Sequence, residues 1–151
     1  MRVPRSTLVV CVALGACAGS QPLLGRPGAL LEWHVSQELW GEETFVIEAD
    51  GEATYRFVPV KGRARPSEEA SLQLEQADLD QLRAVLAKND VCSFRVGRDG
   101  IPDEGMPSLR VRMTGLSCTV ELWDGEWDDN PRARPCAQAI KSLRERVRGS
   151  Q

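Results

Sequence analysis

A β-hairpin centred on Gly51 is the feature that most constrains how this chain can fold. The runs Thr44–Ala49 and Glu52–Val58 are rich in β-branched and aromatic residues and meet at Ala49-Asp50-Gly51. A two-residue turn would mix polar and apolar side chains on each face of the hairpin. A three-residue loop, with Gly51 in the left-handed conformation, instead pairs apolar residues on one face: Phe45 with Tyr55, and Ile47 with Ala53. The hairpin therefore predicts a sheet whose apolar face other elements must cover.

A second hairpin is predicted from Ser108–Met113 and Cys118–Trp123, joined by a four-residue loop over Thr114–Ser117. This register keeps the apolar residues together and also places Arg110 opposite Glu121, as a cross-strand ion pair on the other face. The apolar pairs it predicts are Leu109 with Leu122, Val111 with Val120, and Met113 with Cys118.

Two helices and one further strand complete the predicted domain. Leucine and valine recur at helical spacing over Gln76–Lys88, and Pro135 begins a last helix with apolar positions three and four residues apart. Leu30–Ser36 alternates as a first strand, whereas Lys61–Ala70 reads as a polar loop. The order β-β-β-α-β-β-α predicts the α+β class: an antiparallel sheet of four to five strands with two helices packed on one face. A chain of 151 residues has room for one such domain, over 30–151.

The N-terminal segment has the pattern of an export signal. Arg2 and Arg5 precede an apolar run over Leu8–Leu14, which is too short to span a bilayer as a permanent helix. We expect residues 1–16 to be a signal peptide. Residues 17–29 are rich in Gly and Pro and are expected to form a flexible tether. An ordinary signal peptide, in which Cys17 has no role, is the alternative.

The sequence Leu14-Gly15-Ala16-Cys17 resembles a lipobox, the bacterial signal for attaching lipid to a cysteine. The resemblance implies a lipoprotein that is attached to the membrane by a lipid anchor at Cys17, with palmitate among the acyl groups. Ala18 fits the sorting rule for the outer membrane that accompanies this signal. We therefore expect a lipid-anchored protein of the cell envelope.

Five cysteines must be placed. Cys11 leaves with the signal peptide and Cys17 is the lipidation candidate, which leaves Cys92, Cys118 and Cys136. An exported protein meets an oxidising compartment, so one disulfide and one buried thiol are expected. In the predicted layout Cys92 and Cys136 share one end of the sheet, and Cys118 lies at the far hairpin end. The layout therefore predicts a Cys92–Cys136 disulfide.

The acidic segment Asp124–Asn130 is the sharpest candidate for chemistry. Oxygen side chains at Asp124, Glu126 and Asp128 resemble the start of a calcium loop, although glycine is misplaced and the closing glutamate is missing. These three are weak candidate metal ligands, and a solvated acidic loop is the alternative. No metal or other cofactor is otherwise expected.

Trp123 directly precedes this acidic segment and Trp127 lies within it, and together with Asp128 and Asp129 they are candidates for an exposed partner-binding patch. Tryptophans that cover a thin core are the alternative. The formal net charge is −3, and without Arg2 and Arg5 it becomes −5, which argues against nucleic acid as a partner.

Catalytic motifs are sparse. His34 is the only histidine, and Ser36 is the one nucleophile near it in the sequence. The expected function is a non-catalytic domain that binds an envelope partner through a sheet edge or the Trp123–Asn130 loop. An envelope hydrolase that uses His34 is the alternative from another class.

A resemblance adds a further alternative. The segment Ala49-Asp50-Gly51-Glu52-Ala53-Thr54-Tyr55, the helix through Leu79–Leu86 and the sequence Cys92-Ser93-Phe94 precede a strand pair and a closing helix. In this layout residues 44–148 resemble small bacterial domains of unknown function and the emfourin-type inhibitors of secreted metallopeptidases. The resemblance implies peptidase inhibition and assigns no site residues.

Overall fold

The computed structural model describes residues 27–101 and 103–150, so the predicted signal peptide, Cys17 and most of the tether lie outside it. Along these residues the elements are β1 (Ala29–Gln37), β2 (Gly41–Glu48), β3 (Glu52–Pro59), β4 (Glu68–Gln73), α1 (Gln76–Lys88), the 3-10 helix η1 (Val91–Ser93), β5 (Ser108–Met113), β6 (Leu116–Glu121), α2 (Asp124–Asp129) and α3 (Ala133–Arg148). None of the helices in this part of the chain is both long and apolar enough to cross a membrane.

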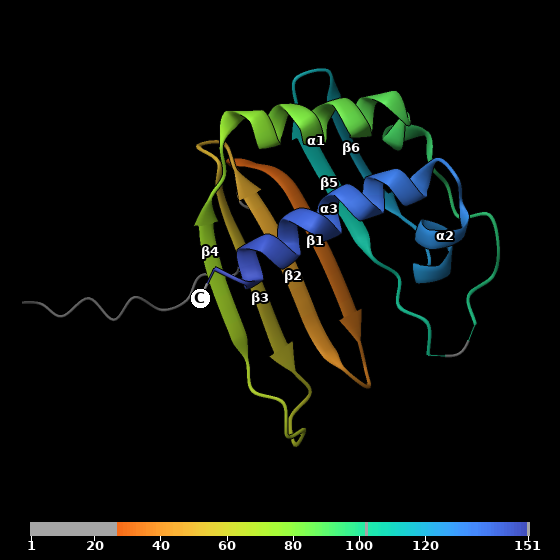
Figure 1. Ribbon diagram of the computed structural model, residues 1–151. Coiled ribbons are helices and arrows are strands. Elements are labelled where there is room, and N and C mark those ends of the chain that lie inside the picture. Colours follow the sequence, from red (N-terminus) through yellow and green to blue (C-terminus); the bar gives the residue numbers. More distant parts are fainter. Residues whose placement is uncertain (1–26, 102, 151) are drawn as a thin grey trace, which may run out of the picture.

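The strands form one antiparallel sheet in the order β4-β3-β2-β1-β5-β6. Helices α1 and α3 lie across one face of it, and α2 lies beside the start of α3 (Figure 1). The predicted α+β class with an antiparallel sheet is confirmed. The predicted counts are wrong by small margins, since the sheet has six strands and there are three α-helices.

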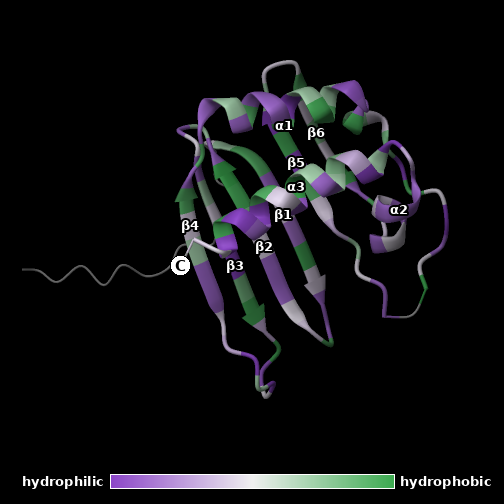
Figure 2. Cartoon of the chain, viewed as in Figure 1, coloured by the Kyte–Doolittle hydropathy of each residue, from purple (hydrophilic) through white to green (hydrophobic). Residues whose placement is uncertain are grey.

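Apolar and polar residues alternate along the strands, as Figure 2 shows, so one face of the sheet supplies the core. Phe45, Ile47 and Tyr55 from the first hairpin are each at most 1% exposed. Helix α1 adds Leu82 and Leu86 to the same core, and α3 adds its own apolar stripe. The core thus lies between the sheet and the two long helices.

The first hairpin has the predicted register. Phe45 is opposite Tyr55, and Ile47 is opposite Ala53. Gly51 has φ of +87°, and a Cβ there would lie 3.1 Å from the carbonyl oxygen of Leu74. A glycine is needed at this position for both its conformation and its close approach to the neighbouring chain.

Strand β4 was not predicted, because its sequence reads as a polar loop. It is an edge strand in which only Ala70 of the six residues is buried, and Ala70 lies opposite Tyr55. Charged residues are typical of sheet edges, where they discourage pairing with other chains. The polar composition that suggested a loop is therefore the composition of an edge strand.

The second hairpin has a register two residues away from the predicted one. Thr114 and Gly115 alone form the turn, and Gly115 has φ of +80°. Leu109 therefore lies opposite Val120, Val111 opposite Cys118, and Met113 opposite Leu116. A shift of two residues leaves every side chain on its original face, so apolar alternation could not separate the two registers.

The predicted Arg110–Glu121 ion pair is replaced by one with another strand. Arg110 lies opposite Thr119 on β6 and opposite Glu32 on β1. Its guanidinium Nη1 is 3.2 Å from Glu32 Oε2, and Arg112 Nη1 is 3.7 Å from Glu32 Oε1. The carboxylate that binds Arg110 thus comes from β1, outside the hairpin. A comparison of registers within the hairpin alone could not identify it.

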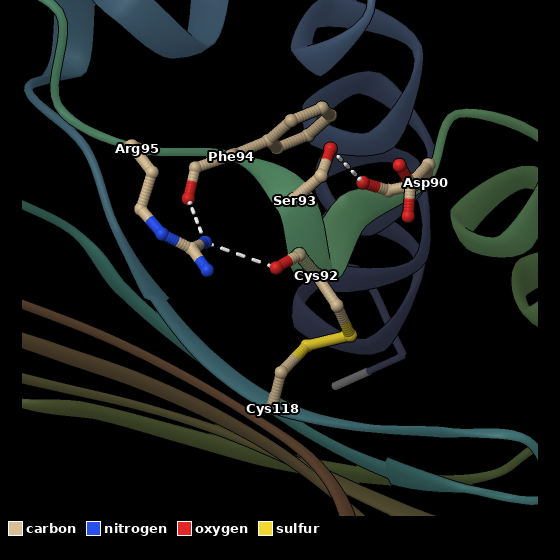
Figure 3. Close-up of a disulfide and its surroundings, with 6 residues drawn as sticks. All are labelled: Asp90, Cys92, Ser93, Phe94, Arg95 and Cys118. Atoms are coloured by element: carbon tan, nitrogen blue, oxygen red, sulfur yellow. Dashed lines mark hydrogen bonds between the residues drawn. A yellow bond between two sulfur atoms is a disulfide. The ribbon is translucent and has the colours of Figure 1, made fainter.

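The predicted Cys92–Cys136 disulfide is wrong, because Cys92 is bonded to Cys118. The shorter turn moves Cys118 away from the turn to a position opposite Val111 in the middle of the edge strand β6, and η1 packs against β6. Figure 3 shows Cys92 on η1 and Cys118 on the strand beneath it. Arg95 Nη1 donates to the carbonyl oxygen of Cys92 at 3.0 Å, which ties the following loop to the same point.

Cys136 is a buried free thiol. Its Sγ lies 3.7 Å from the carbonyl oxygen of Arg132 in the same helix and 4.0 Å from that of Val85 in α1. Burial raises the pKa of this thiol to about 11, so it stays protonated and unreactive at neutral pH. Cys136 therefore fills the space between α1 and α3.

Candidate ligand-binding site

An open cleft of about 380 Å³ lies where β1, β2 and β3 approach the β1–β2 turn and meet α2 and α3. Its lining combines aromatic rings with ionic side chains of both signs. The residues are Trp33, Val35, Gln37, Trp40, Gly41, Glu43, Phe57, Arg65, Asp124, Trp127, Asp128, Ala137, Ile140, Lys141 and Arg144. Aromatic walls with a few placed polar groups are typical of small-molecule sites.

Trp40 projects at the mouth of the cleft because of the tight β1–β2 turn. Its N–H donates to the carbonyl oxygen of Gln37 at 3.2 Å, and its side chain is 62% exposed. The next residue, Gly41, has φ of +122°, and a Cβ there would lie 2.2 Å from the carbonyl oxygen of Val58. No other residue fits this contact, so Gly41 holds the turn and Trp40 against β3.

Trp33 and Trp127 form the inner wall. Their ring centroids are 5.1 Å apart, and Phe94 packs edge-on against Trp127 at 6.2 Å. Trp127 is only 2% exposed, so the expectation that it belongs to an exposed patch is wrong; it is a core residue whose ring also reaches the cleft. Among the described residues, neither indole N–H of this pair has a hydrogen-bond acceptor.

An ion pair crosses the cleft from the sheet to α3. Arg144 Nη1 contacts Glu43 Oε1, and the hydroxyl of Tyr55 donates to Glu43 Oε2 at 3.4 Å. Burial, with the nearby Glu43 carboxylate, raises the pKa of Tyr55. Arg65 Nη2 lies 2.9 Å from Glu68 Oε1, and its guanidinium lies over the Phe57 ring. The Glu43, Arg65 and Arg144 charges are therefore balanced within the protein.

Asp124 is half-buried at the other side of the cleft. Its Oδ2 accepts a hydrogen bond from Gln37 Nε2 at 3.2 Å. Burial raises the pKa of Asp124, and the negative charges of Glu104 and Asp128 add to the effect. Within residues 27–101 and 103–150, the side chains of Asp128 and Lys141 make no hydrogen bond or ion pair. The cleft thus keeps one free anion and one free cation for a ligand.

The acidic segment Asp124–Asp129 is a short helix, α2, and not the predicted loop. Glu126 Oε2 accepts the backbone N–H of Trp123 at 3.1 Å, and its Oε1 accepts that of Gly97, so this carboxylate caps the helix. The calcium-loop hypothesis needed Asp124, Glu126 and Asp128 to converge. In the part of the chain that the structure covers, no three His, Cys, Asp or Glu residues are grouped to hold a metal ion.

Residues 95–101 and 103–107 form a strap that is hydrogen-bonded to α2 beside the site. Glu104, whose side chain is 7% exposed, binds Arg98 Nη1 at 2.8 Å and accepts the backbone N–H of Gly125 at 2.8 Å. Half-buried Trp123 lies beneath the strap and donates its indole N–H to the carbonyl oxygen of Arg98 at 3.2 Å. A Cβ at Gly100 would lie 2.4 Å from the Trp123 ring. Trp123 therefore supports the strap and does not line the cleft.

Replacing Glu104 by glutamine is expected to change how stability depends on pH. Hydrogen bonds from Arg98 lower the pKa of Glu104 from 4.5 to about 2. The ionised carboxylate therefore stabilises the fold above pH 4.5, and this stabilisation is lost as the pH falls through about 2. We expect the melting temperature of Glu104→Gln to fall less steeply over this window than that of the parent chain.

The exposed carboxylate of Glu121 offers a matched control for this measurement. Glu121→Gln should follow the pH profile of the parent chain. Parallel profiles for Glu104→Gln and the parent chain would show that the Arg98–Glu104 contact does not hold in solution.

His34 lies on the sheet face opposite to the cleft, since it alternates with Trp33 along β1. Its Nε2 is 3.2 Å from Glu42 Oε1 on the neighbouring strand, and Ser108 lies opposite it on β5. Ser36, the nucleophile nearest to His34 in the sequence, lies opposite Glu42. The histidine is therefore separated from the cleft by the thickness of the sheet.

Of the residues singled out in the sequence, Asp124 and Asp128 line the cleft, Trp127 forms its inner wall, and Asp129 is exposed outside it. Sequence reasoning missed Gln37, Trp40, Glu43, Lys141 and Arg144. The only local signal was a tryptophan directly before a glycine in a turn. No protein-family model and no curated protein matches this chain.

Proposed function

We propose that this chain is a lipid-anchored protein of the cell envelope whose domain binds a ligand in the cleft between the sheet and helices α2 and α3. The observation that carries the proposal is the composition of the cleft. It combines the exposed ring of Trp40, the buried wall of Trp33 and Trp127, and the charges of Asp128 and Lys141, which have no partner in the part of the chain that the structure describes. An exposed aromatic ring beside ionic groups is suited to an amphipathic ligand.

Binding, and not catalysis, is the activity that this arrangement favours. The groups that line the cleft are carboxylates, cations, rings and an amide, with no cysteine, serine or histidine among them. The Glu43 carboxylate is engaged by Arg144 and by the Tyr55 hydroxyl, so it is not free to act as a general base. The envelope location rests on the signal-peptide and lipobox patterns at residues 1–17.

A tryptophan placed at the cleft mouth should block ligand binding. Lys141 is exposed on α3 and lines the cleft, so Lys141→Trp fills part of it with little effect on the core. We expect an enzymatic digest of purified bacterial envelopes to raise the melting temperature of the parent chain by several degrees and that of Lys141→Trp by less than one degree.

Gln138→Trp provides the control, because Gln138 is exposed on the same helix and does not line the cleft. It should respond to the digest as the parent chain does. An equal rise for Lys141→Trp and Gln138→Trp would place any binding outside the cleft and would contradict the proposal.

Removing the lipid anchor should release the protein from membranes. In cells given labelled palmitate, we expect the parent chain to carry the label and to sediment with the membrane fraction, and Cys17→Ala to do neither. Cys11→Ala, which changes the other cysteine of the leader, should behave as the parent chain does. Labelled Cys17→Ala protein would overturn the anchor.

A further inference from the structure

We propose that the ligand of this cleft is a neutral oligosaccharide, with one sugar ring held in the cleft and the next stacked on Trp40. This inference rests on the proposed binding function and adds the chemical class of the ligand. It is carried by the charge balance of the lining, by its aromatic surfaces, and by a second hollow that continues the cleft.

The charge balance selects against a strongly ionic ligand. Three carboxylates, of Glu43, Asp124 and Asp128, face three cations, of Arg65, Lys141 and Arg144. A ligand of either sign would gain from one set and be repelled by the other. Hydroxyl groups both donate and accept, so a neutral polyol can bond both to the carboxylate of Asp128 and to the ammonium of Lys141, neither of which has a partner among residues 27–101 and 103–150.

The aromatic rings of the cleft are suited to the apolar face of a sugar ring. A pyranose ring has an apolar C–H face, which packs on an aromatic ring, and a rim of hydroxyls. Trp40 is 62% exposed at the mouth, and the guanidinium carbon of Arg63 lies over its ring, 5.6 Å from the centroid, so a sugar would stack on the face away from Arg63. Trp33 and Trp127 stand behind it, and their indole N–H groups have no acceptor among the described residues. Both nitrogen atoms are themselves buried, so this wall offers a ligand its ring carbons and not these two donors.

The cleft continues past Trp40 into a second hollow of about 220 Å³. The two hollows share Gln37 and Trp40, so one ligand can occupy both and cross the Trp40 ring between them. Glu38 and Asp103 of the second hollow are acceptors for hydroxyl donors and would repel an anionic chain. This geometry favours a neutral chain of several sugar units over a single sugar.

Titration of the full chain with defined sugars tests this inference through tryptophan fluorescence. The probes are cellotetraose, maltotetraose and N-acetylchitotetraose, each compared with its monosaccharide. At least one tetrasaccharide should bind about tenfold more tightly than its monosaccharide, because only the longer chain reaches both hollows. Tetragalacturonate, which is anionic, should bind more weakly than that neutral tetrasaccharide.

Trp40→Ala should weaken binding of the tetrasaccharide about tenfold. Ile101→Ala is the matched control: Ile101 is 64% exposed and lines neither hollow, so binding should be unchanged. Circular dichroism of both variants should match that of the parent chain. Failure of all three neutral tetrasaccharides to bind at roughly 10 mM, or equal binding by Trp40→Ala, overturns the inference.

Tetra-alanine peptide separates this inference from the proposed function. If none of the sugars binds, but the peptide binds and Lys141→Trp abolishes that binding, the cleft is a ligand site and the saccharide assignment is wrong. If neither sugars nor peptide bind, and the envelope digest has no effect on the melting temperature, both proposals fail.

Discussion

Replacing Trp127 by alanine is expected to lower the free energy of unfolding by about 3–5 kcal/mol, the usual cost of removing a buried large aromatic side chain. Trp127 is 2% exposed and packs against the rings of Trp33 and Phe94. Few atoms near it could collapse into the space, because α2 is held by the strap and by α3. The main effect of Trp127→Ala should therefore be a loss of stability, and any loss of ligand binding should be secondary to it.

Urea unfolding of the full chain measures this effect, and Trp40→Ala provides the matched control. Both substitutions remove an indole, but Trp40 is exposed at the turn and should cost roughly 0.5 kcal/mol or less. Equal losses for Trp127→Ala and Trp40→Ala would contradict the assignment of Trp127 to the core. They would also restore the exposed patch that the sequence suggested.

Removing the Cys92–Cys118 disulfide is expected to cost about 3–4 kcal/mol in the chain-entropy account. The bond closes a loop with a sequence separation of 26 and joins η1 to the middle of β6. Without it, the unfolded chain gains conformational freedom and η1 loses its attachment to the sheet. The double substitution Cys92→Ala, Cys118→Ala should therefore lower the urea midpoint substantially.

Reduction separates this pairing from the one predicted from the sequence. Dithiothreitol should lower the melting temperature of the parent chain and leave Cys118→Ala unchanged, because the bond is already absent there. Cys136→Ala should stay sensitive to dithiothreitol, since Cys136 is a free thiol. The opposite pattern, with Cys118→Ala sensitive and Cys136→Ala insensitive, would support a Cys92–Cys136 bond.

The two hairpins explain why the sequence predicted some parts of the fold and not others. Around Gly51 a wrong loop length changes the register by one residue and places polar and apolar side chains on the same face. The pairing of Phe45 with Tyr55 therefore identifies the correct register. Around Gly115 the competing registers differ by two residues and keep the faces. The ion pair chosen to decide between them was misleading, because Arg110 binds Glu32 on a strand 78 residues away.

The disulfide error followed from that register. Placing Cys118 next to the turn removed it from the reach of η1, which left Cys136 as the only partner for Cys92. Helix bounds were easier: the spacing of apolar residues predicted Gln76–Lys88, and α1 has these bounds. The spacing of apolar residues within one element therefore predicted its bounds correctly, whereas the sequence did not predict which residues of different elements are in contact.

The cleft could not be predicted for the same reason. Its walls come from β1, β2, β3, α2 and α3, which lie far apart in the sequence and meet only in the folded domain. The acidic segment was noticed, but its residues have different roles: Asp124 and Asp128 line the cleft, whereas Glu126 caps a helix. The spacing of acidic residues identified this segment as a candidate site, but it could not show which of the side chains face the cleft.

The indole N–H signals of the four tryptophans give the most direct test that the cleft is the binding site. Trp33, Trp40 and Trp127 line the cleft, and Trp123 lies under the strap as an internal control. In nitrogen-15 spectra of the full chain, adding the envelope digest should shift the signals of Trp33, Trp40 and Trp127 and leave that of Trp123 in place. Shifts confined to Trp123, or no shift in any of the four, would contradict the account.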